Sequence, residues 1–480
     1  MESMNRKRFL EQYTYAVQND FTSPSGEPAA WTPGHPKHWG QERAKIPLGG
    51  KASSLALSPD EKLIAVGIEE DIHVFDVTTQ ERLEVLRGHT ETASKVRFCP
   101  SLIMNNKSGK DENQKTTRYI LVSQSSPQEG RLVILWELDE HGRLVRKGRE
   151  KKSVTVDALA DKILKPLVTE ITADYGWDHA EKAIRALDHE VRNTLRNVIR
   201  LHEQEDKICF EGELASFGSP TFSSDGKFMI YLSNNQTTQH GTREAASLPC
   251  VNLWDVETNS LQYQLLGHTD SVMWAAMSPD SMLVASIAWD GTARIWDARS
   301  GVCFHVLGPF GGQLWSGAFS PCGKYLAISQ GSPKTYIHVY DISTGHPVSR
   351  FEGFRHWARS LAWSPDGTMI AGGERDAELL IWDPYTGEER MRWRLGFDNN
   401  MMRRFAYIRG VQFVDGGRKL MFQILDGTVE VYDFQSNLKK QFTRRAEDKI
   451  DEYHIPQMVC SDLGLLVVPD GDGVLRLWDV

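Results

Sequence analysis

The stretch LGHTDSVMWAAMSPDSMLVASIAWDGTARIWD, residues 266–297, decides the fold of this 480-residue chain. Apolar residues alternate with polar or small ones on either side of its turns, which is typical of strands with one buried face. The Ser-Pro-Asp sequence at 278–280 predicts a turn, because proline presets φ. The Asp-Gly pair at 290–291 supplies the positive φ that a tight hairpin needs. The stretch therefore predicts short antiparallel strands joined by tight turns.

The end of this stretch, an apolar or aromatic residue followed by an acid, recurs along the chain. Eight segments carry it: Val74-Phe75-Asp76, Leu135-Trp136-Glu137, Leu253-Trp254-Asp255, Ile295-Trp296-Asp297, Val339-Tyr340-Asp341, Ile381-Trp382-Asp383, Val431-Tyr432-Asp433 and Leu477-Trp478-Asp479. From Asp255 onward the acids lie 42 to 50 residues apart. A period near forty with four short strands per unit is typical of β-propeller blades. We therefore expect an all-β propeller with eight blades, one for each signature.

The stretch 266–297 resembles the WD40 family in its Gly-His pair at 267–268, its two turn sequences and its Trp-Asp ending. In that family a histidine, a strand serine or threonine, a turn aspartate and a tryptophan form a buried hydrogen-bond network. The resemblance implies the same structural tetrad here for His268, Ser286, Asp290 and Trp296. It also implies a WD40-type propeller over residues 44–480. Seven blades are the alternative, because that number is more frequent in the family.

The other repeats depart from this pattern, so the chain resembles a diverged member of the family. The histidine is replaced in two blades and the tryptophan in three, by Phe354 and Glu213 and by Phe75, Tyr340 and Tyr432. Two further blades keep one pair each, His89 with Trp136 and Asp376 with Trp382. Most blades are therefore expected to hold together by core packing and sheet hydrogen bonds.

The two ends of the repeat array predict how the ring closes. The last signature, at 478–480, completes a third strand and leaves no fourth. Residues 44–50 (AKIPLGG) stand where a fourth strand and its glycine turn precede a new blade. We expect this strand to join the C-terminal blade, so that no sheet edge stays open. Residues 1–43 are then an extended N-terminal leader.

The second blade carries a long insertion, since the acids Glu137 and Asp255 lie 118 positions apart. Apolar residues recur at helical spacing over 156–171 and 180–198, and Asp178 and Glu181 suit a capping box. These patterns predict an α-helical hairpin over 153–205, between the third and fourth strands of blade 2. Whether the hairpin caps the propeller or mediates assembly is left open by the sequence.

Arginines and aromatic residues gather in the predicted loops of blades 5 to 7. These loops join fourth to first and second to third strands, and they form the face on which propellers usually bind partners. Arginine and aromatic side chains are the usual anchors of protein interfaces, and guanidinium groups match carboxylates and phosphates. We expect the patch to bind a partner protein, with an acidic or phosphorylated peptide as the ligand. Its residues are Phe310, Trp315, Phe354, Arg355, His356, Trp357, Arg359, Arg403, Arg404, Phe405, Tyr407 and Arg409.

Three alternatives to this interpretation stay open. The aromatic residues can belong to blade cores, with the arginines paired to acids. Asp297 and Arg299 resemble the WDxR-type box of substrate receptors of cullin-RING ubiquitin ligases, which implies that they contact the ligase adaptor. Arginines with aromatic rings also suit single-stranded nucleic acid, as in a subunit of a nucleic-acid-associated complex, but a net charge of −9 argues against a general nucleic-acid grip.

Composition and motifs exclude several other classes. The sequence has no HExxH, GxSxG, P-loop or Rossmann motif, so we expect no enzyme and no cofactor. Six scattered cysteines without a CxxC favour buried free thiols in a reducing compartment over disulfides or a metal site. We find no signal-peptide core and no apolar run of about 18 residues. A non-catalytic interaction scaffold in the cytoplasm or nucleus, away from membranes, is the resulting prediction.

Overall fold

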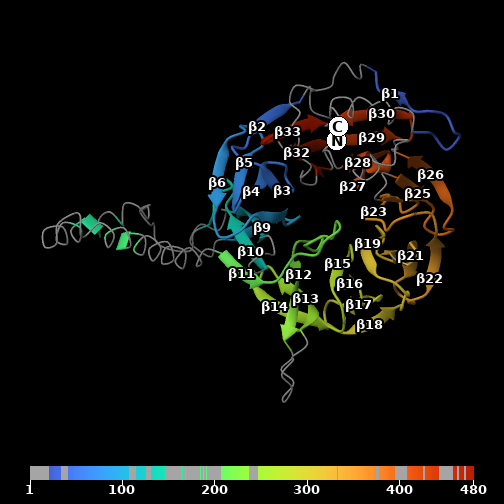
Figure 1. Cartoon of the computed structure of the whole chain (residues 1–480), viewed down its shortest axis with the longest axis horizontal. Helices are drawn as coiled ribbons and strands as arrows, with labels where there is room; N and C mark the ends of the chain where they lie inside the picture. The colour runs from blue at the N-terminus through green and yellow to red at the C-terminus, as the bar shows by residue number, and fades with distance from the viewer. Residues whose placement is uncertain are drawn as a thin grey trace, which may run out of the picture.

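The computed structural model describes residues 21–33, 42–106, 115–125, 131–145, 207–236, 247–331, 333–374, 378–394, 408–424, 428–442, 458–461, 464–469 and 472–480, and eight single positions between 160 and 191. Within these residues the strands form eight sheets, arranged as blades in a ring (Figure 1). The chain is therefore an all-β, eight-bladed propeller. The expectation of eight blades is confirmed, and the alternative of seven is wrong.

The first four blades occupy the first half of the ring. Blade 1 contains β3 (Ala52–Leu57), β4 (Leu63–Ile68), β5 (Asp71–Asp76) and β6 (Arg82–Leu86). Blade 2 contains β7 (Ala93–Phe98), β9 (Lys115–Ser125), β10 (Leu132–Leu138) and β11 (Lys207–Glu211), with β8 (Ile103–Asn106) paired to β9. Blade 3 contains β12 (Phe228–Gln236), β13 (Ser247–Asp255) and β14 (Ser260–Leu266), and its inner segment makes only the bridges Glu213–Leu232 and Phe222–Met229. Blade 4 contains β15 (Val272–Met277), β16 (Leu283–Ala288), β17 (Ala293–Asp297) and β18 (Cys303–Leu307).

The second half of the ring continues in the same order. Blade 5 contains β19 (Leu314–Phe319), β20 (Tyr325–Gln330), β21 (Tyr336–Asp341) and β22 (Pro347–Phe351). Blade 6 contains β23 (Ser360–Trp363), β24 (Ile370–Gly373), β25 (Glu378–Trp382) and β26 (Glu389–Arg394). Blade 7 contains β27 (Ile408–Val414), the 3₁₀ helix η2 (Asp415–Gly417), β28 (Lys419–Ile424), β29 (Val429–Asp433), β30 (Leu438–Phe442) and the added strand β1 (Ala30–Trp31). Blade 8 contains β31 (Val459–Cys460), β32 (Leu465–Pro469), β33 (Val474–Asp479) and β2 (Ala44–Pro47).

Two segments near the N-terminus bind the last two blades. β2 pairs antiparallel with β33 and forms the outer strand of blade 8, so residues from both ends of the array share one sheet. Ile46 is buried in a core that combines apolar residues of blades 8 and 1. β1 pairs in parallel with β30, and the ring of Phe21, fully buried, packs between Trp393 and Tyr432. The segment 21–33, which we call the leader strap, thus lies along the outer wall of blades 6 and 7.

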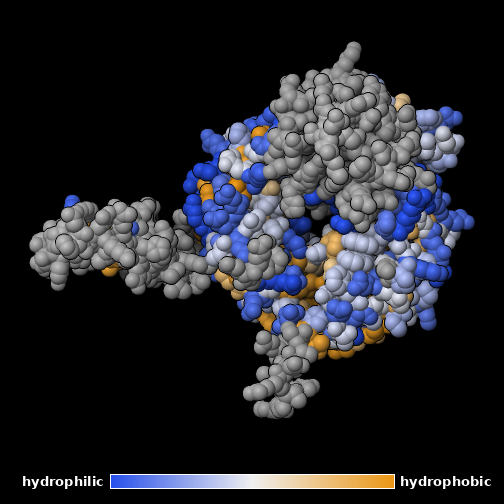
Figure 2. Space-filling model, viewed as in Figure 1, coloured by the Kyte–Doolittle hydropathy of each residue, from blue (hydrophilic) through white to orange (hydrophobic). Residues whose placement is uncertain are grey.

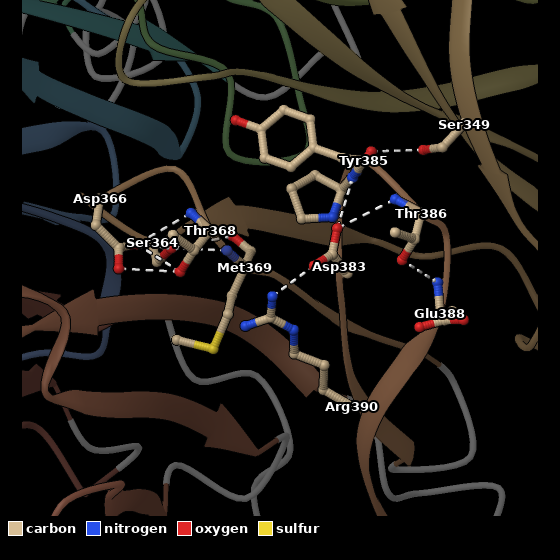
Figure 3. A network of polar contacts seen from close by, with 11 residues as sticks. Ser349, Ser364, Asp366, Thr368, Met369, Asp383, Tyr385, Thr386, Glu388 and Arg390 are labelled. Carbon is tan, nitrogen blue, oxygen red and sulfur yellow. Dashed lines mark hydrogen bonds and ion pairs between the residues drawn. The ribbon is translucent and has the colours of Figure 1, made fainter.

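In six of the eight blades, the described contacts show that the recurring acid at the end of the third strand shapes the turn that follows it. In blade 6, Asp383 accepts hydrogen bonds from the backbone N–H groups of Tyr385 and Thr386 at 2.9 and 3.1 Å and pairs with Arg390 at 2.5 Å (Figure 3). Burial alone would raise the pKa of Asp383, but these contacts lower it overall. Backbone N–H groups bind the equivalent acid in five other blades, at Asp76, Asp255, Asp297, Asp341 and Asp433. The signature is therefore a requirement of the turn.

Two expectations from the sequence are not met. Of the predicted helical hairpin at 153–205, between β10 and β11, eight scattered positions from Ala160 to Val191 are described as helical, and the rest lies outside the described residues. These positions do not establish a helix, so the hairpin is not supported. All six cysteines lie in the described part of the chain without a disulfide, but Cys209 and Cys322 are exposed because they lie on outer strand β11 and in a turn, respectively. Among the described residues no helix is long and apolar enough to cross a membrane.

Candidate functional site

Four side chains of blade 4 form one hydrogen-bonded network. His268 Nε2 lies 2.8 Å from the Ser286 hydroxyl, and His268 Nδ1 lies 2.8 Å from Asp290 Oδ2. Trp296 Nε1 donates to the Ser286 hydroxyl at 2.9 Å. Burial alone would raise the pKa of Asp290, but hydrogen bonds from His268 and Thr292 outweigh it and lower the pKa. The network ties the β14–β15 turn to the β16–β17 turn, and we call the face that carries these turns the top face.

Blade 2 keeps three members of this network. His89 Nε2 lies 2.7 Å from the Ser123 hydroxyl, which also accepts a hydrogen bond from Trp136 Nε1 at 2.8 Å. The sequence indicated His89 and Trp136 but not Ser123, which lies within the long strand β9. Burial lowers the pKa of His89 to about 4, so its imidazole is neutral at pH 7.

Two aromatic residues assigned to the partner-binding patch pack in blade interiors. Phe354 is 7% exposed and packs edge-on against Trp382, with ring centroids 5.7 Å apart. Phe310 is half-buried against His338 and Tyr340, at 4.6 and 5.6 Å. Both stand just before an inner strand, where blade 4 has its histidine, and apolar rings there complete the blade core. The burial of Phe354 therefore contradicts its place in the patch, whereas Phe310 is half-buried and its place in the patch stays a prediction.

Asp297 and Arg299, the proposed adaptor contacts, lie in the β17–β18 turn on the opposite face. Asp297 Oδ1 accepts hydrogen bonds from the backbone N–H groups of Arg299 and Ser300 at 3.0 and 2.8 Å. Arg299 is exposed, and its carbonyl oxygen accepts a hydrogen bond from Tyr263. Acids of five other blades bind their turns in the same way, so these contacts do not set this turn apart.

Four aromatic side chains of blades 3 to 6 meet at the top face around the central channel. Trp315 stacks on Trp357 with ring centroids 4.0 Å apart and planes inclined by 10°. Phe217 presents its ring at right angles to both, at 5.8 and 5.3 Å, and Trp289 lies edge-on to Trp315 at 5.1 Å. The edge-to-face contacts are of the kind that aromatic quadrupoles favour. The four rings, which we call the aromatic cluster, are all half-buried and retain exposed surface.

The loop before β23 carries the basic residues next to this cluster. The Arg359 guanidinium lies 4.8 Å from the centroid of the Trp357 ring, a cation–π contact. The side chains of Arg355 and His356 are exposed, while their backbone N–H groups both donate to Glu374 Oε2 at 2.9 Å. Glu374 is fully buried, and burial raises its pKa to about 7. One buried carboxyl group thus holds the loop in place.

The remaining predicted residues come from blade 7. Arg409, the second residue of β27, is half-buried and lines a cavity in the channel. Burial and the charge of Arg359 lower its pKa, which places the two guanidinium groups near each other. Figure 2 shows the ring hollowed at its centre, where the channel opens. The other four residues of the patch lie outside the described part of the chain: Arg403, Arg404, Phe405 and Tyr407.

The structure therefore brings Trp315, Trp357, Arg359 and Arg409 together, and sequence analysis missed two members of the aromatic cluster. Phe217 lies in the irregular inner segment of blade 3, at a positive φ of 54°, where no strand pattern marks it. Trp289 precedes the Asp-Gly turn of the best-matching repeat, so the sequence pattern marks it only as part of that repeat. Its position at the tip of a hairpin on the top face was the feature of the sequence that could have indicated a place in the aromatic cluster.

Comparisons with known proteins agree with this architecture. The WD domain, G-beta repeat family matches residues 259–297 and 345–383. The target of rapamycin complex subunit wat1 of Schizosaccharomyces pombe is 32% identical over 22% of this chain and 32% of its own length. The small ribosomal subunit protein RACK1y of Oryza sativa is 30% identical over 28% of this chain and 40% of its own length. The alignments span between 22% and 45% of the length of the curated relatives reported for the chain.

A solved structure shares the fold. Chaetomium thermophilum Sqt1, bound to the N-terminus of the ribosomal protein L10, superposes with a TM-score of 0.55 over 92% of this chain and 100% of its own, at 16% identity. Such low identity shows the fold alone. With two matched repeats, a repeat network in blade 4 and eight blades in the ring, the chain is an eight-bladed β-propeller that contains WD40 repeats.

Proposed function

We propose that this propeller is a non-catalytic scaffold that binds a partner protein over the top-face opening of its channel. The observation that carries the proposal is the aromatic cluster, whose stacked Trp315 and Trp357 keep exposed surface beside the Arg359 guanidinium. Aromatic rings and arginines are the residues that most often dominate binding energy at protein interfaces. A rigid array of such anchors loses little side-chain entropy when a partner binds.

The supports of these anchors fit a preformed site. Trp315 lies against Gly331, where an added Cβ would stand 2.4 Å from the indole nitrogen. Phe217 fills the angle between the two stacked rings, and Glu374 fixes the loop that carries Trp357 and Arg359. The site therefore does not need to be ordered by its partner.

The relatives favour assembly as the general role. The names of wat1 and RACK1y place them in a target of rapamycin complex and in the small ribosomal subunit, and the Sqt1 structure holds a segment of another protein. For this chain we propose the finer statement that the bound segment is acidic or phosphorylated, because Arg355, His356 and Arg359 lie on one loop beside the rings.

Quantitative mass spectrometry after affinity purification from the protein's own cells tests this function. Trp357→Ala removes one ring of the stacked pair, and Tyr385→Ala, a 44% exposed ring in the opposite-face turn of blade 6, is the matched control (Figure 3). We expect Trp357→Ala to reduce a stoichiometric partner by about tenfold or more, while the control retains it. Equal recovery with both variants, each with the melting temperature of the wild type, contradicts the proposal.

A further inference from the structure

The central channel contains a cavity whose lining is unlike the rest of this acidic protein. It has a volume of about 360 Å³ and lies between the starts of β3, β7 and β27 and the inner segment of blade 3. Lys95, Arg97 and Arg409 line it together with five serines, three other small residues and two larger apolar ones, and none of the described lining residues is acidic. We call this cavity the channel pocket. Three cations thus share one cavity in a chain of net charge −9.

The charges of the pocket are held in place by the fold. Lys95 Nζ donates to the carbonyl oxygens of Leu214 and Ala215 at 2.6 and 3.2 Å, which fixes it between blades 2 and 3. Burial lowers the pKa of Lys95 to about 8, so the ammonium group remains mostly charged at pH 7. Arg97 NH1 donates to the carbonyl oxygen of Val96 at 2.8 Å. Neither residue makes a described ion pair with a carboxylate.

One carboxylate acts on the pocket from its edge. Glu213 lies close enough to raise the pKa of Lys95, but burial outweighs this effect. The Glu213 carboxylate is itself paired with Arg131 at 2.5 Å. Across the pocket, Arg359 adds a further positive charge close to Arg409. Gathering like charges in a partly buried cavity is unfavourable, and an anion bound between them would offset that cost.

We propose that the channel pocket binds the phosphate group of a phosphorylated side chain on the partner segment. This inference rests on the proposed function, since Phe217 belongs both to the pocket and to the aromatic cluster. A segment whose apolar residue contacts the rings therefore has a neighbouring residue above the pocket. A phosphate dianion matches several cations better than a single carboxylate does, because it presents more charge and three acceptor oxygens.

The serines of the channel pocket contribute to its shape rather than to its charge. Ser53 and Ser54 both donate to the carbonyl oxygen of Ala93 at 2.7 Å, so their protons are already used. Their small side chains leave the space open, and Arg97 and Arg409 supply the guanidinium groups that line the pocket. The cavity is large enough for a phosphate with the stem of its side chain.

Binding of defined probes to the full chain tests the pocket directly. Inorganic phosphate and N-acetyl-O-phosphoserine amide are titrated at constant ionic strength and followed by ³¹P NMR line broadening. Arg97→Gln and Arg409→Gln are the test variants, and Arg350→Gln, an exposed arginine paired with Glu352, is the matched control. We expect about tenfold weaker binding in each test variant and no change in the control. Equal binding in all four proteins overturns the pocket.

The source of the phosphate and the scaffold itself are tested separately. Phosphatase treatment of the partner is expected to reduce its capture as much as Arg97→Gln does, and undiminished capture would overturn a phosphorylated side chain in favour of a free phosphorylated ligand. Tighter binding of an oligothymidylate than of the phosphoserine probe would favour nucleic acid and overturn the proposal. Loss of capture in Trp357→Ala with phosphate binding intact supports both proposals. Capture that survives Trp357→Ala contradicts the proposed function and with it the phosphorylated side chain, and phosphate binding that persists then identifies a pocket for a free phosphorylated ligand.

Discussion

The same substitution in two blades isolates the contribution of one buried carboxylate. His268 and His89 both contact a strand serine that also binds a tryptophan indole. Only His268 has a described aspartate on its second nitrogen, Asp290, at 2.8 Å. Changing each histidine to alanine therefore removes the same ring and the same serine contact. We expect His268→Ala to cost more stability than His89→Ala because it leaves Asp290 without its histidine.

The expected difference follows from the contacts that each variant loses. Loss of the histidine–serine hydrogen bond costs about 1 kcal/mol in either blade. His89 Nδ1 is buried without a hydrogen-bond partner among the described residues, so its removal also relieves a penalty. Loss of a hydrogen bond to a buried charged group costs about 1.5–3 kcal/mol, and Asp290, with a side chain 6% exposed, keeps hydrogen bonds from Thr292. We expect His268→Ala to be less stable than His89→Ala by about 2–3 kcal/mol.

Native-state hydrogen exchange at pH 7 measures both losses in place, since amides of β16–β17 and β9–β10 report on blades 4 and 2 separately. The pKa of Asp290 is lowered in the folded state. The extra loss of stability in His268→Ala is therefore fully present above about pH 4, the pKa of an aspartate in the unfolded chain. It decreases as the pH falls through the folded-state pKa. Equal losses in the two blades, or a larger loss for His89→Ala, would refute the role given to the carboxylate.

Three further predictions concern other parts of the ring. Burial lowers the pKa of His89 and His338 to about 4 in the folded state. As the pH falls, the unfolded state therefore binds protons before the folded state does, and the urea midpoint is expected to fall between pH 6.5 and 4. His338→Gln should flatten this dependence, and an unchanged slope would contradict it. Phe21→Ala removes a fully buried ring, at a cost of about 3–5 kcal/mol in a core, and should release the leader strap to proteases while the propeller stays folded; full protease protection would count against this. Gly331→Ala should displace Trp315 and change the near-ultraviolet circular dichroism of the stacked pair, whereas an unaltered spectrum would show that the ring has room.

The fold was predictable because the repeated residues have a local mechanical role. An acid such as Asp383 binds the backbone N–H groups of the next turn, so the same residue type recurs at this turn in other blades. Closure by β2 followed from the same periodicity, which left one strand missing at the end of the array. The insertion in blade 2 was located by spacing, but helical periodicity alone does not establish its conformation.

The site was only partly predictable, because loops of one face do not all point toward solvent. Phe354 stands at the position where blade 4 has its histidine, and this alignment indicates a buried side chain. The arginines next to it in the sequence suggested an exposed one, but Phe354 is buried against Trp382. Lys95 and Arg97 lie within an inner strand. The alternation of side chains along a strand indicates which residues face the channel, but it does not show which of them face one another. Their convergence with Arg409 depends on the closure of the ring, which no local pattern contains.

The closed ring gives its channel a polarity that constrains how a partner binds. The aromatic rings come from blades 3 to 6. The cations of the channel pocket come from blades 2 and 7, which are separated in the ring by blades 8 and 1. Phe217 and Arg359 mark the two borders between these halves, since each contacts one half and lies near the other. A segment that crosses the opening must place its apolar side chains over Trp315 and its anionic group over Arg409. We therefore expect order along the segment to matter, so that a peptide with the same residues in scrambled sequence binds more weakly even though its charge and composition are unchanged.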